Sequence, residues 1–267
     1  MLKLRNIKGK DLEQKIDLVN DKWKSLDIDI EATGDKMKGE KNYPYEIGIN
    51  VTDQDNKILF KCSLMISDIF KDEIKMNSAF FRNKIPFYND KMSVFCQDKD
   101  AHLYKSVNIK EALEILNAII KKFNIKIISA YNVSYDHEGI NFLYDLRPSV
   151  KNQFAKLNDI DIMKLFTMTL EMFPRTRKKF IEFCKENGFV TASGNCIINA
   201  EVVYKFITKK LDFKEKHTGL EDLKIERKIR RWCIMKFKKA NKPFIYELNT
   251  RKKGNLYKGE NALLKAY

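Results

Sequence analysis

The chain has 267 residues, of which 44% are hydrophobic, and this suits one or two globular domains with a sizeable core. It has no run of about 18 apolar residues and no apolar region in its N-terminal segment, so we expect neither a membrane-spanning helix nor a secretory signal. The net charge is +15, and residues 203–267 carry 19 Lys and Arg against 7 Asp and Glu, which favours a polyanionic partner such as nucleic acid.

The first part of the chain predicts one helix followed by three strands. Apolar residues at mostly helical spacing predict a helix over residues 11–25. Residues 24–31, 45–53 and 57–66 indicate three consecutive strands, with a polar turn between the last two. Residues 67–107 show no clean period, and we expect an insertion or a long functional loop there.

The second part alternates strands and helices. The expected elements are an amphipathic helix at 108–124, a buried strand at 125–132, a helix at 133–146, a short strand-like segment at 159–167, and helices at about 175–187, 199–211 and 218–240. This order predicts a mixed-sheet α/β domain over residues 1–240 and a basic extension over 241–267. The five cysteines show neither C-x-x-C nor metal-ligand spacing, so we expect reduced thiols.

Acidic and apolar residues alternate at the end of the first predicted strand, in the sequence DIDIEATG. On a strand, this alternation puts Asp27, Asp29 and Glu31 on one face. Carboxylates this close repel one another, and hard oxygen ligands at a sheet edge suit Mg²⁺ or Mn²⁺. A D-x-E pair also occurs by chance on a solvated strand face, so a cation site needs further ligands from elsewhere in the chain.

A second polar cluster, NVSYD at residues 132–136, spans a predicted strand-to-helix turn. Asp136 falls in the first helical turn, where an acid is favoured by the helix dipole alone. Asn132 suits a turn or a helix cap equally well. This segment alone therefore does not identify a site.

A third cluster, HTGLED at residues 217–222, opens the last predicted helix. Thr218 and Glu221 have the spacing of a capping box and so have an expected structural role. His217 and Asp222 have no such expected structural role. The ordinary explanation for His217 is a surface histidine, and for Asp222 an acid that complements the helix dipole. The next basic stretch, ERKIRR, is expected to be a solvated helix face.

Together these three segments resemble the DEDDh exonucleases, the DnaQ-like or proofreading-type 3′→5′ exonucleases with an RNase H-like fold. The matching motifs are D-x-E-x-T-G, N-x-x-[FY]-D and H-x₄-D, in the family's order and structural contexts. The resemblance covers residues 24 to 238 and is closest to the branch from Gram-positive bacteria and their phages. It implies an α/β fold with an RNase H-like mixed sheet flanked by helices. Asp27 departs from the pattern, because an apolar residue is usual there; it is not assigned as a ligand, and either supports the ligands or faces solvent.

The resemblance implies a hydrolase that removes nucleoside 5′-monophosphates from the 3′ end of single-stranded DNA or RNA. The implied catalytic residues are Asp29, Glu31, Asp136, Asp222 and His217. The four acids would hold two divalent cations, Mg²⁺ or Mn²⁺, with Asp29 bridging the two and Asp136 acting through water. His217 would take the proton from the attacking water. Without cations, we expect raised pKa values in this acidic cluster.

The same resemblance implies contacts with the substrate. Thr33 and Gly34 would bring the backbone close to the terminal nucleotide, and Asn132 and Ser134 would contact its phosphate or sugar. For Asn132 and Ser134, simple turn chemistry explains the residues equally well.

Two basic segments outside the motifs are candidate nucleic-acid contacts. The first holds three aromatic residues that would stack on bases and two basic residues that would touch phosphates: Phe80, Phe81, Tyr88, Arg82 and Lys84. Packing of the same aromatic rings on the core is the alternative. The second, residues 251–253, would follow the nucleic-acid backbone or form a solvated end.

Two other functions fit the same sequence. One is a non-catalytic nucleic-acid-binding subunit that keeps the fold, although all five catalytic positions are filled here. The other is the proofreading subunit of a polymerase, which would need a polymerase or a replication or repair protein as partner. An A+T-rich codon usage would explain the excess of Lys over Arg without any partner. We expect a cytoplasmic protein of a bacterial or phage-infected cell, and the sequence leaves the oligomeric state open.

Overall fold

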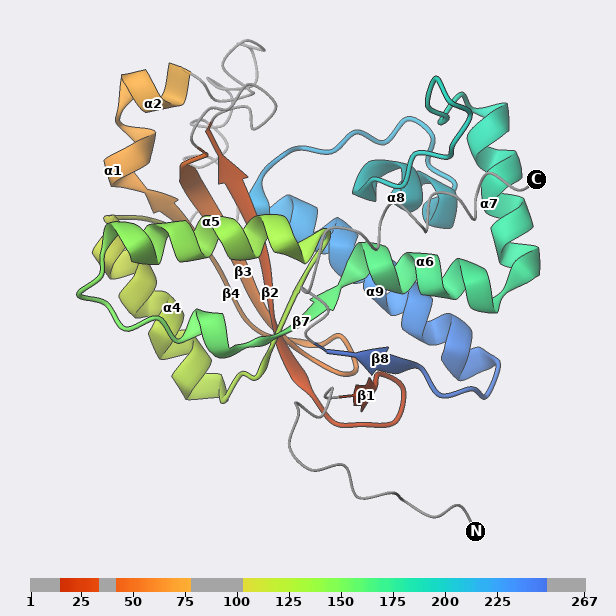
Figure 1. Cartoon of the computed structure of the whole chain (residues 1–267), viewed down its shortest axis with the longest axis horizontal. Coiled ribbons are helices and arrows are strands. Elements are labelled where there is room, and N and C mark those ends of the chain that lie inside the picture. Colours follow the sequence, from red (N-terminus) through yellow and green to blue (C-terminus); the bar gives the residue numbers. More distant parts are fainter. Residues whose placement is uncertain (1–14, 34–41, 78–102, 249–267) are drawn as a thin grey trace.

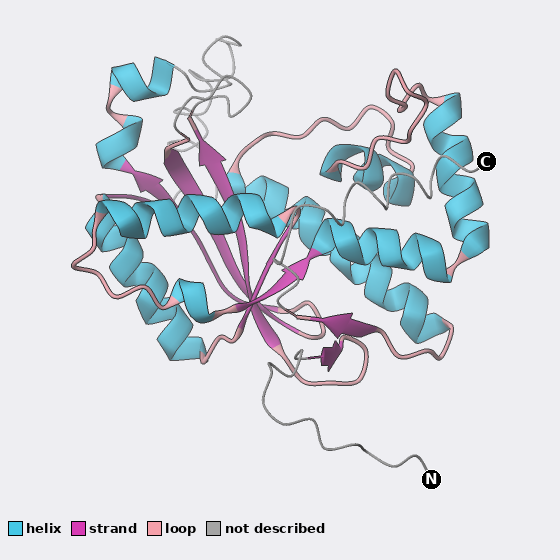
Figure 2. Ribbon diagram, viewed as in Figure 1, coloured by secondary structure: helices cyan, strands magenta, loops and turns pink. Residues whose placement is uncertain are grey.

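The computed structural model describes residues 15–33, 42–77 and 103–248. In these ranges the chain forms a mixed six-stranded sheet with helices on both faces and a separate two-stranded sheet (Figures 1 and 2). The strand order of the large sheet is β5-β4-β3-β2-β6-β7. Its strands are β2 (Lys24–Ala32), β3 (Pro44–Asp53), β4 (Ile58–Ile66), β5 (Tyr104–Val107), β6 (Ile127–Ala130) and β7 (Asn158–Asp161).

Strands β2, β3 and β4 form the predicted antiparallel meander, and β6 and β7 extend it in parallel. The structure therefore confirms the predicted α/β class and its RNase H-like mixed sheet flanked by helices. Strand β5 lies inside the predicted insertion and pairs in parallel with β4. The division into domains at residues 67, 107 and 240 stays a prediction.

Two hydrophobic cores cover the two faces of the sheet. Ile128 belongs to the core formed with α1, α4 and α5, whereas its neighbour Ile127 belongs to the core formed with α6, α7, α8 and α9. In Figure 1, α4 and α5 lie on the opposite side of the molecule from α6, α7 and α8. The helices are α1 (Ser67–Phe70), α2 (Glu73–Asn77), α4 (Ile109–Phe123), α5 (Val133–Leu146), the 3₁₀ helix η4 (Phe154–Lys156), α6 (Ile162–Met172), α7 (Pro174–Glu186), α8 (Ala200–Thr208) and α9 (Gly219–Lys239).

Side-chain alternation along β2 separates an apolar face from a polar one. Leu26, Ile28 and Ile30 belong to the core with α4 and α5. The alternate residues carry polar groups, and the opposite positions of β3 do so too, except for one glycine. They are Ser25, Asp27, Asp29 and Glu31 on β2 and Glu46, Gly48, Asn50 and Thr52 on β3. This polar face is covered by α9, and that contact positions the candidate site.

Most predicted helices begin and end close to the expected residues. Helix α4 begins at a capping box in which Asn108 accepts a hydrogen bond from the Glu111 N–H and the Glu111 carboxylate accepts one from Asn108. The cysteines in the described ranges are buried free thiols, as predicted: Cys62, Cys184, Cys196 and Cys233. No helix in the described ranges combines the length and apolar character that a bilayer crossing requires.

The predicted helix over residues 11–25 is wrong in its described part. Residues Lys15–Asp17 form the short strand β1, which pairs with β8 (Ile245–Glu247). The Asp17 carboxylate then accepts a hydrogen bond from the Val19 N–H at 2.9 Å and closes a turn. Ile16 and Leu18 are both buried and two residues apart, so the apolar spacing here has the period of a strand.

The strand-like segment predicted at 159–167 is also corrected. The strand ends at Asp161, whose side chain accepts hydrogen bonds from the Met163 and Lys164 N–H groups and caps α6. Gly34, Cys96, the aromatic and basic residues between positions 80 and 88, and residues 251–253 lie outside the described residues.

Candidate active site

The site begins where the N-terminus of α9 meets strand β3. A Cβ atom on Gly219 would lie 2.6 Å from the Gly48 nitrogen and 2.7 Å from the Gly48 Cα. The two backbones can approach this closely only because both residues are glycine. Gly48 is paired with Asp29 across the sheet, and Asp222 lies in the first turn of α9. The two glycines therefore bring the acid of the third motif to the acid of the first.

A buried carboxylate holds the start of α9 in this position. Glu46, on β3, accepts hydrogen bonds from the Gly219 N–H at 3.2 Å and from the Ser63 hydroxyl at 2.9 Å. Glu46 is fully buried. A negative charge at the N-terminus of a helix is favourable, because the free N–H groups there carry partial positive charge.

Asp136 joins the site through the backbone of β2. Its Oδ1 accepts a hydrogen bond from the Ile30 N–H at 3.0 Å, so the side chain lies beside the backbone between Asp29 and Glu31. Asp136 is 3% exposed. Burial, and then the charge of Asp29, raise the pKa of Asp136 well above its usual value. The raised pKa expected for this cluster is therefore found at Asp136.

Three residues from the first and third motifs converge at one point. Glu31, His217 and Asp222 each have a potential ligand atom, and these atoms lie within 4.8 Å of one another. Two groups that hydrogen-bond to the same water are separated by ~4.6 Å, for ~2.8 Å bonds at a tetrahedral angle. A single water or cation can thus contact these side chains together.

The backbone at His217 is unusual. Its φ of 53° lies in the left-handed region, which residues other than glycine adopt rarely and which is found often at functional sites. The loop before it is tied to α8, because the Glu201 carboxylate of that helix accepts a hydrogen bond from the Glu215 N–H at 3.0 Å. The Lys205 ammonium, on the same helix, donates to this carboxylate at 2.6 Å. These contacts hold the segment that presents the imidazole.

The capping box predicted at the start of α9 does not form. Thr218 is the N-cap residue, but its side chain makes no capping hydrogen bond, and its Oγ1 is buried without a partner in the described part of the chain. Glu221 pairs instead with Lys224, three residues along the helix. Glu46 provides from β3 a hydrogen-bond acceptor at this helix start.

Sequence reasoning missed a further acid, Glu226, one helical turn after Asp222. It is 4% exposed and accepts a hydrogen bond from the Tyr131 backbone N–H. Burial, followed by the charges of Asp29 and Asp136, raises the pKa of Glu226 well above its usual value. The signal available in the sequence was its spacing of four residues from Asp222, which puts both on one helix face.

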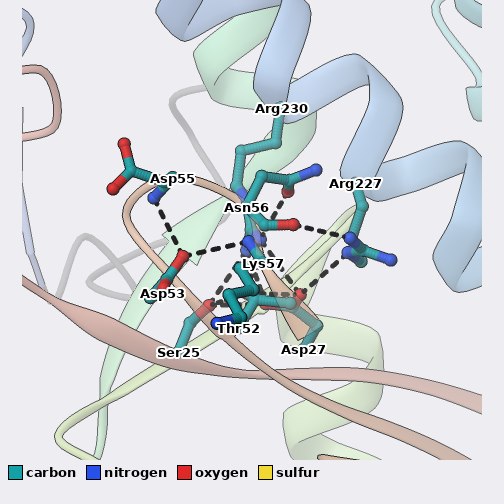
Figure 3. A network of polar contacts seen from close by, with 9 residues as sticks. All are labelled: Ser25, Asp27, Thr52, Asp53, Asp55, Asn56, Lys57, Arg227 and Arg230. Atoms are coloured by element: carbon teal, nitrogen blue, oxygen red, sulfur yellow. Dashed lines mark hydrogen bonds and ion pairs between the residues drawn. The ribbon is translucent and has the colours of Figure 1, made fainter. Parts of the chain in front are cut away.

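Asp27 has a different partner from the other acids on its strand. It is 1% exposed and forms a two-point ion pair with Arg230 of α9, at 2.5 and 3.0 Å (Figure 3). Ser25 and Thr52 also donate hydrogen bonds to it. Asp27 is therefore neither solvent-facing nor available as a ligand. The expectation that ERKIRR forms a solvated helix face is wrong at Glu226 and Arg230, which are both buried.

The structure describes Thr33, Asn132 and Ser134 of the substrate-binding candidates. Thr33 is fully buried, and its hydroxyl accepts a hydrogen bond from the Tyr43 N–H at 3.2 Å. Asn132 is exposed, has a φ of 60° and makes no side-chain capping bond. Ser134 is half-buried in the first turn of α5. The structure thus uses the Thr33 hydroxyl to join two strands and leaves the Asn132 side chain at the surface.

The donor set fits hard divalent cations. It consists of carboxylate oxygens and one imidazole, and oxygen-rich sets suit Mg²⁺ and Mn²⁺. Several of the acids are buried together, although like charges repel strongly when water is excluded. A cation among Glu31, Asp222 and the neighbouring acids would remove that repulsion.

No family model and no curated protein matches the chain. Among solved structures, one of 3′-end-specific recognition of a histone mRNA stem-loop by a 3′-exonuclease is 14% identical, with a TM-score of 0.45 over 80% of this chain and 64% of that one. Escherichia coli exonuclease I in complex with a dA16 oligonucleotide is 11% identical, with a TM-score of 0.46 over 78% of this chain and 40% of that one. This chain thus spans less than two thirds of either protein, and neither likeness assigns it an activity.

Proposed function

We propose that the protein is a divalent-metal-dependent 3′→5′ exonuclease of the DEDDh type that acts on single-stranded DNA or RNA. The observation that carries the proposal is the convergence of Glu31, His217 and Asp222, with Asp136 hydrogen-bonded to the backbone beside them. These residues come from distant parts of the chain, and the fold brings their potential ligand atoms to one point.

The proposed roles are those that the resemblance to the DEDDh exonucleases implies. Asp29, Glu31, Asp136 and Asp222 would hold two cations, which, when bound, lower the pKa of a water and offset charge on the scissile phosphate. His217 would accept the proton of the attacking water, because histidine is the most common general base at neutral pH and this imidazole lies within one water of two carboxylates.

The excess of basic residues in the last quarter of the chain supports a polyanionic substrate. Hydrolysis at the 3′ end would release nucleoside 5′-monophosphates. Thr33, Gly34, Asn132 and Ser134 remain the proposed contacts to the terminal nucleotide. A polymerase or a replication or repair protein as partner, and a place in the cytoplasm, stay predictions.

The test is digestion of single-stranded DNA and RNA labelled at either end, with Mg²⁺, Mn²⁺ or EDTA. The variants are Asp29→Asn and Asp222→Asn, which keep the shape of the side chain and remove its charge. Glu221→Gln is the control, since Glu221 lies beside Asp222 in sequence but pairs with Lys224.

Shortening from the 3′ end that needs a cation, survives in the control and disappears in both variants is the expected result. Binding of the labelled strands without cleavage by the wild-type protein would reject the enzyme and leave a nucleic-acid-binding subunit. Cleavage that persists in both variants would place the active site elsewhere.

A further inference from the structure

Glu226 occupies a place on α9 that helix packing alone would fill with an apolar residue. Its neighbours on the same buried face include Leu223, Ile229 and Cys233. A carboxylate removed from water is costly unless it is paired and hydrogen-bonded. The presence of an acid among apolar residues therefore needs an explanation beyond packing.

The described part of the chain provides little compensation for this carboxylate. The Tyr131 N–H donates one hydrogen bond, while Oε2 is buried without a partner among the described residues. The charged groups that act on Glu226 include Asp29, Asp136 and Asp222, and all three are acidic. The arginine one turn further along α9 is already bound at two points to Asp27. The three neighbouring acids supply no positive charge to Glu226, and a cation bound from solution would supply one.

Tyr131 also ties Glu226 to the second motif. It stands immediately before Asn132, and its backbone N–H links the end of β6 to α9 through Glu226. Glu226 therefore joins α9, whose first turn carries Asp222, to the segment that leads into α5 and Asp136.

We propose that Glu226 is a positioning residue of the cation centre, whose Oε2 accepts a hydrogen bond from a cation-bound water and so strengthens divalent-cation binding. This inference rests on the proposed function, because it assumes that the neighbouring acids bind cations. It adds a fifth carboxylate, which the three sequence motifs do not contain. In proteins, such outer groups typically change metal affinity ~10–100-fold.

The test is calorimetric titration with Mg²⁺ and with Mn²⁺, near neutral pH, of the wild-type protein, Glu226→Gln and the control Glu221→Gln. Glutamine keeps an oxygen for the Tyr131 N–H but removes the charge. We expect Glu226→Gln to weaken cation binding ~10–100-fold and to raise the melting temperature of the EDTA-treated protein. The control should change neither. A purely structural role would change the melting temperature and leave the cation affinity as it is.

Cation affinity within twofold of wild type in Glu226→Gln would overturn the proposal. If Glu226→Gln does not fold, Glu226→Leu gives the same comparison, because leucine matches the apolar neighbours on that helix face. A wild-type protein that binds no divalent cation would overturn both this inference and the proposed function. A third outcome combines two results: the wild-type protein binds cations but cleaves no nucleic acid, and Glu226→Gln binds cations more weakly than the wild type. This outcome would support the role of Glu226 and reject the exonuclease.

Discussion

Replacing Arg230 by methionine should destabilise the protein strongly, because it leaves a buried charge without its partner. Arg230 and Asp27 are each 1% exposed and are joined by two hydrogen bonds of 2.5 and 3.0 Å. Arg230 also donates to Ser25, Thr52 and Asn56, at 3.0, 2.7 and 3.2 Å. Removal of one member of a buried pair costs about 3–5 kcal/mol, and we expect Arg230→Met to lower the free energy of unfolding by that amount.

A double-mutant cycle separates the ion pair from the packing of the methylene groups. Asp27→Leu alone should also be strongly destabilising, because it leaves the Arg230 charge buried and unpaired. The double variant Asp27→Leu/Arg230→Met leaves neither charge, so its loss should be well below the sum of the two single losses. Urea unfolding followed by circular dichroism measures all four proteins. A loss under about 1 kcal/mol for Arg230→Met, or additive single losses, would refute this account of the pair.

The other predictions concern the start of α9 and the loop before it. Gly219→Ala should displace the helix, because the new Cβ would lie 2.6 Å from the Gly48 nitrogen; nuclease activity and cation affinity should fall together, and unchanged values would show that α9 is not fixed there. Mg²⁺ at 100 times its Kd should stabilise the wild-type protein by about 2.7 kcal/mol, and this stabilisation should vanish with EDTA or with Asp222→Asn in a thermal melt. Burial, and then the charge of Glu201, raise the pKa of Glu215 from 4.5 to about 7. Between these pH values the unfolded chain is ionised while the folded protein keeps its proton, so stability falls as pH rises. Glu215→Gln should remove this part of the pH dependence, and parallel pH profiles of the two proteins would contradict it.

The sheet could be predicted from the sequence because its strands have a simple pattern. The alternating segment from Leu26 to Glu31 lies in strand β2, and the continuous apolar run before Asn132 contains strand β6. The helix predicted over 11–25 failed because a spacing of two residues, Ile16 to Leu18, was embedded in a longer pattern with mixed spacing. Its partner strand, β8, lies more than 200 residues away in sequence, and local spacing contains no information about that pairing.

The sequence motifs named the acids but not the contacts that bring them together. Gly48 in the middle of a strand was a signal for a close backbone approach, yet its partner Gly219 could not be identified without the fold. Glu226 and Arg230 were hidden in a stretch dominated by charge. A charged stretch on a helix is usually solvated, and here two of its members point into the protein because the facing strand is itself polar.

The polar face of β2 and β3 explains why acids on one strand have two different roles, one in an ion pair and the others in the candidate cation site. Helix α9 contacts it through Gly219 at one point and Arg230 at another, and these two residues are eleven positions apart, which corresponds to ~16 Å along the helix. At the Arg230 end, the protein neutralises Asp27 with its own cation. At the Gly219 end, the chain gathers Asp29, Glu31, Asp136 and Asp222, and burial and the charges of neighbouring acids raise the pKa values of Asp136 and Glu226. The ion pair fixes α9 to β2 at one end of this polar face. An acidic cluster held in this way would bind a cation with little reorganisation, because the fold has already brought its potential ligands together.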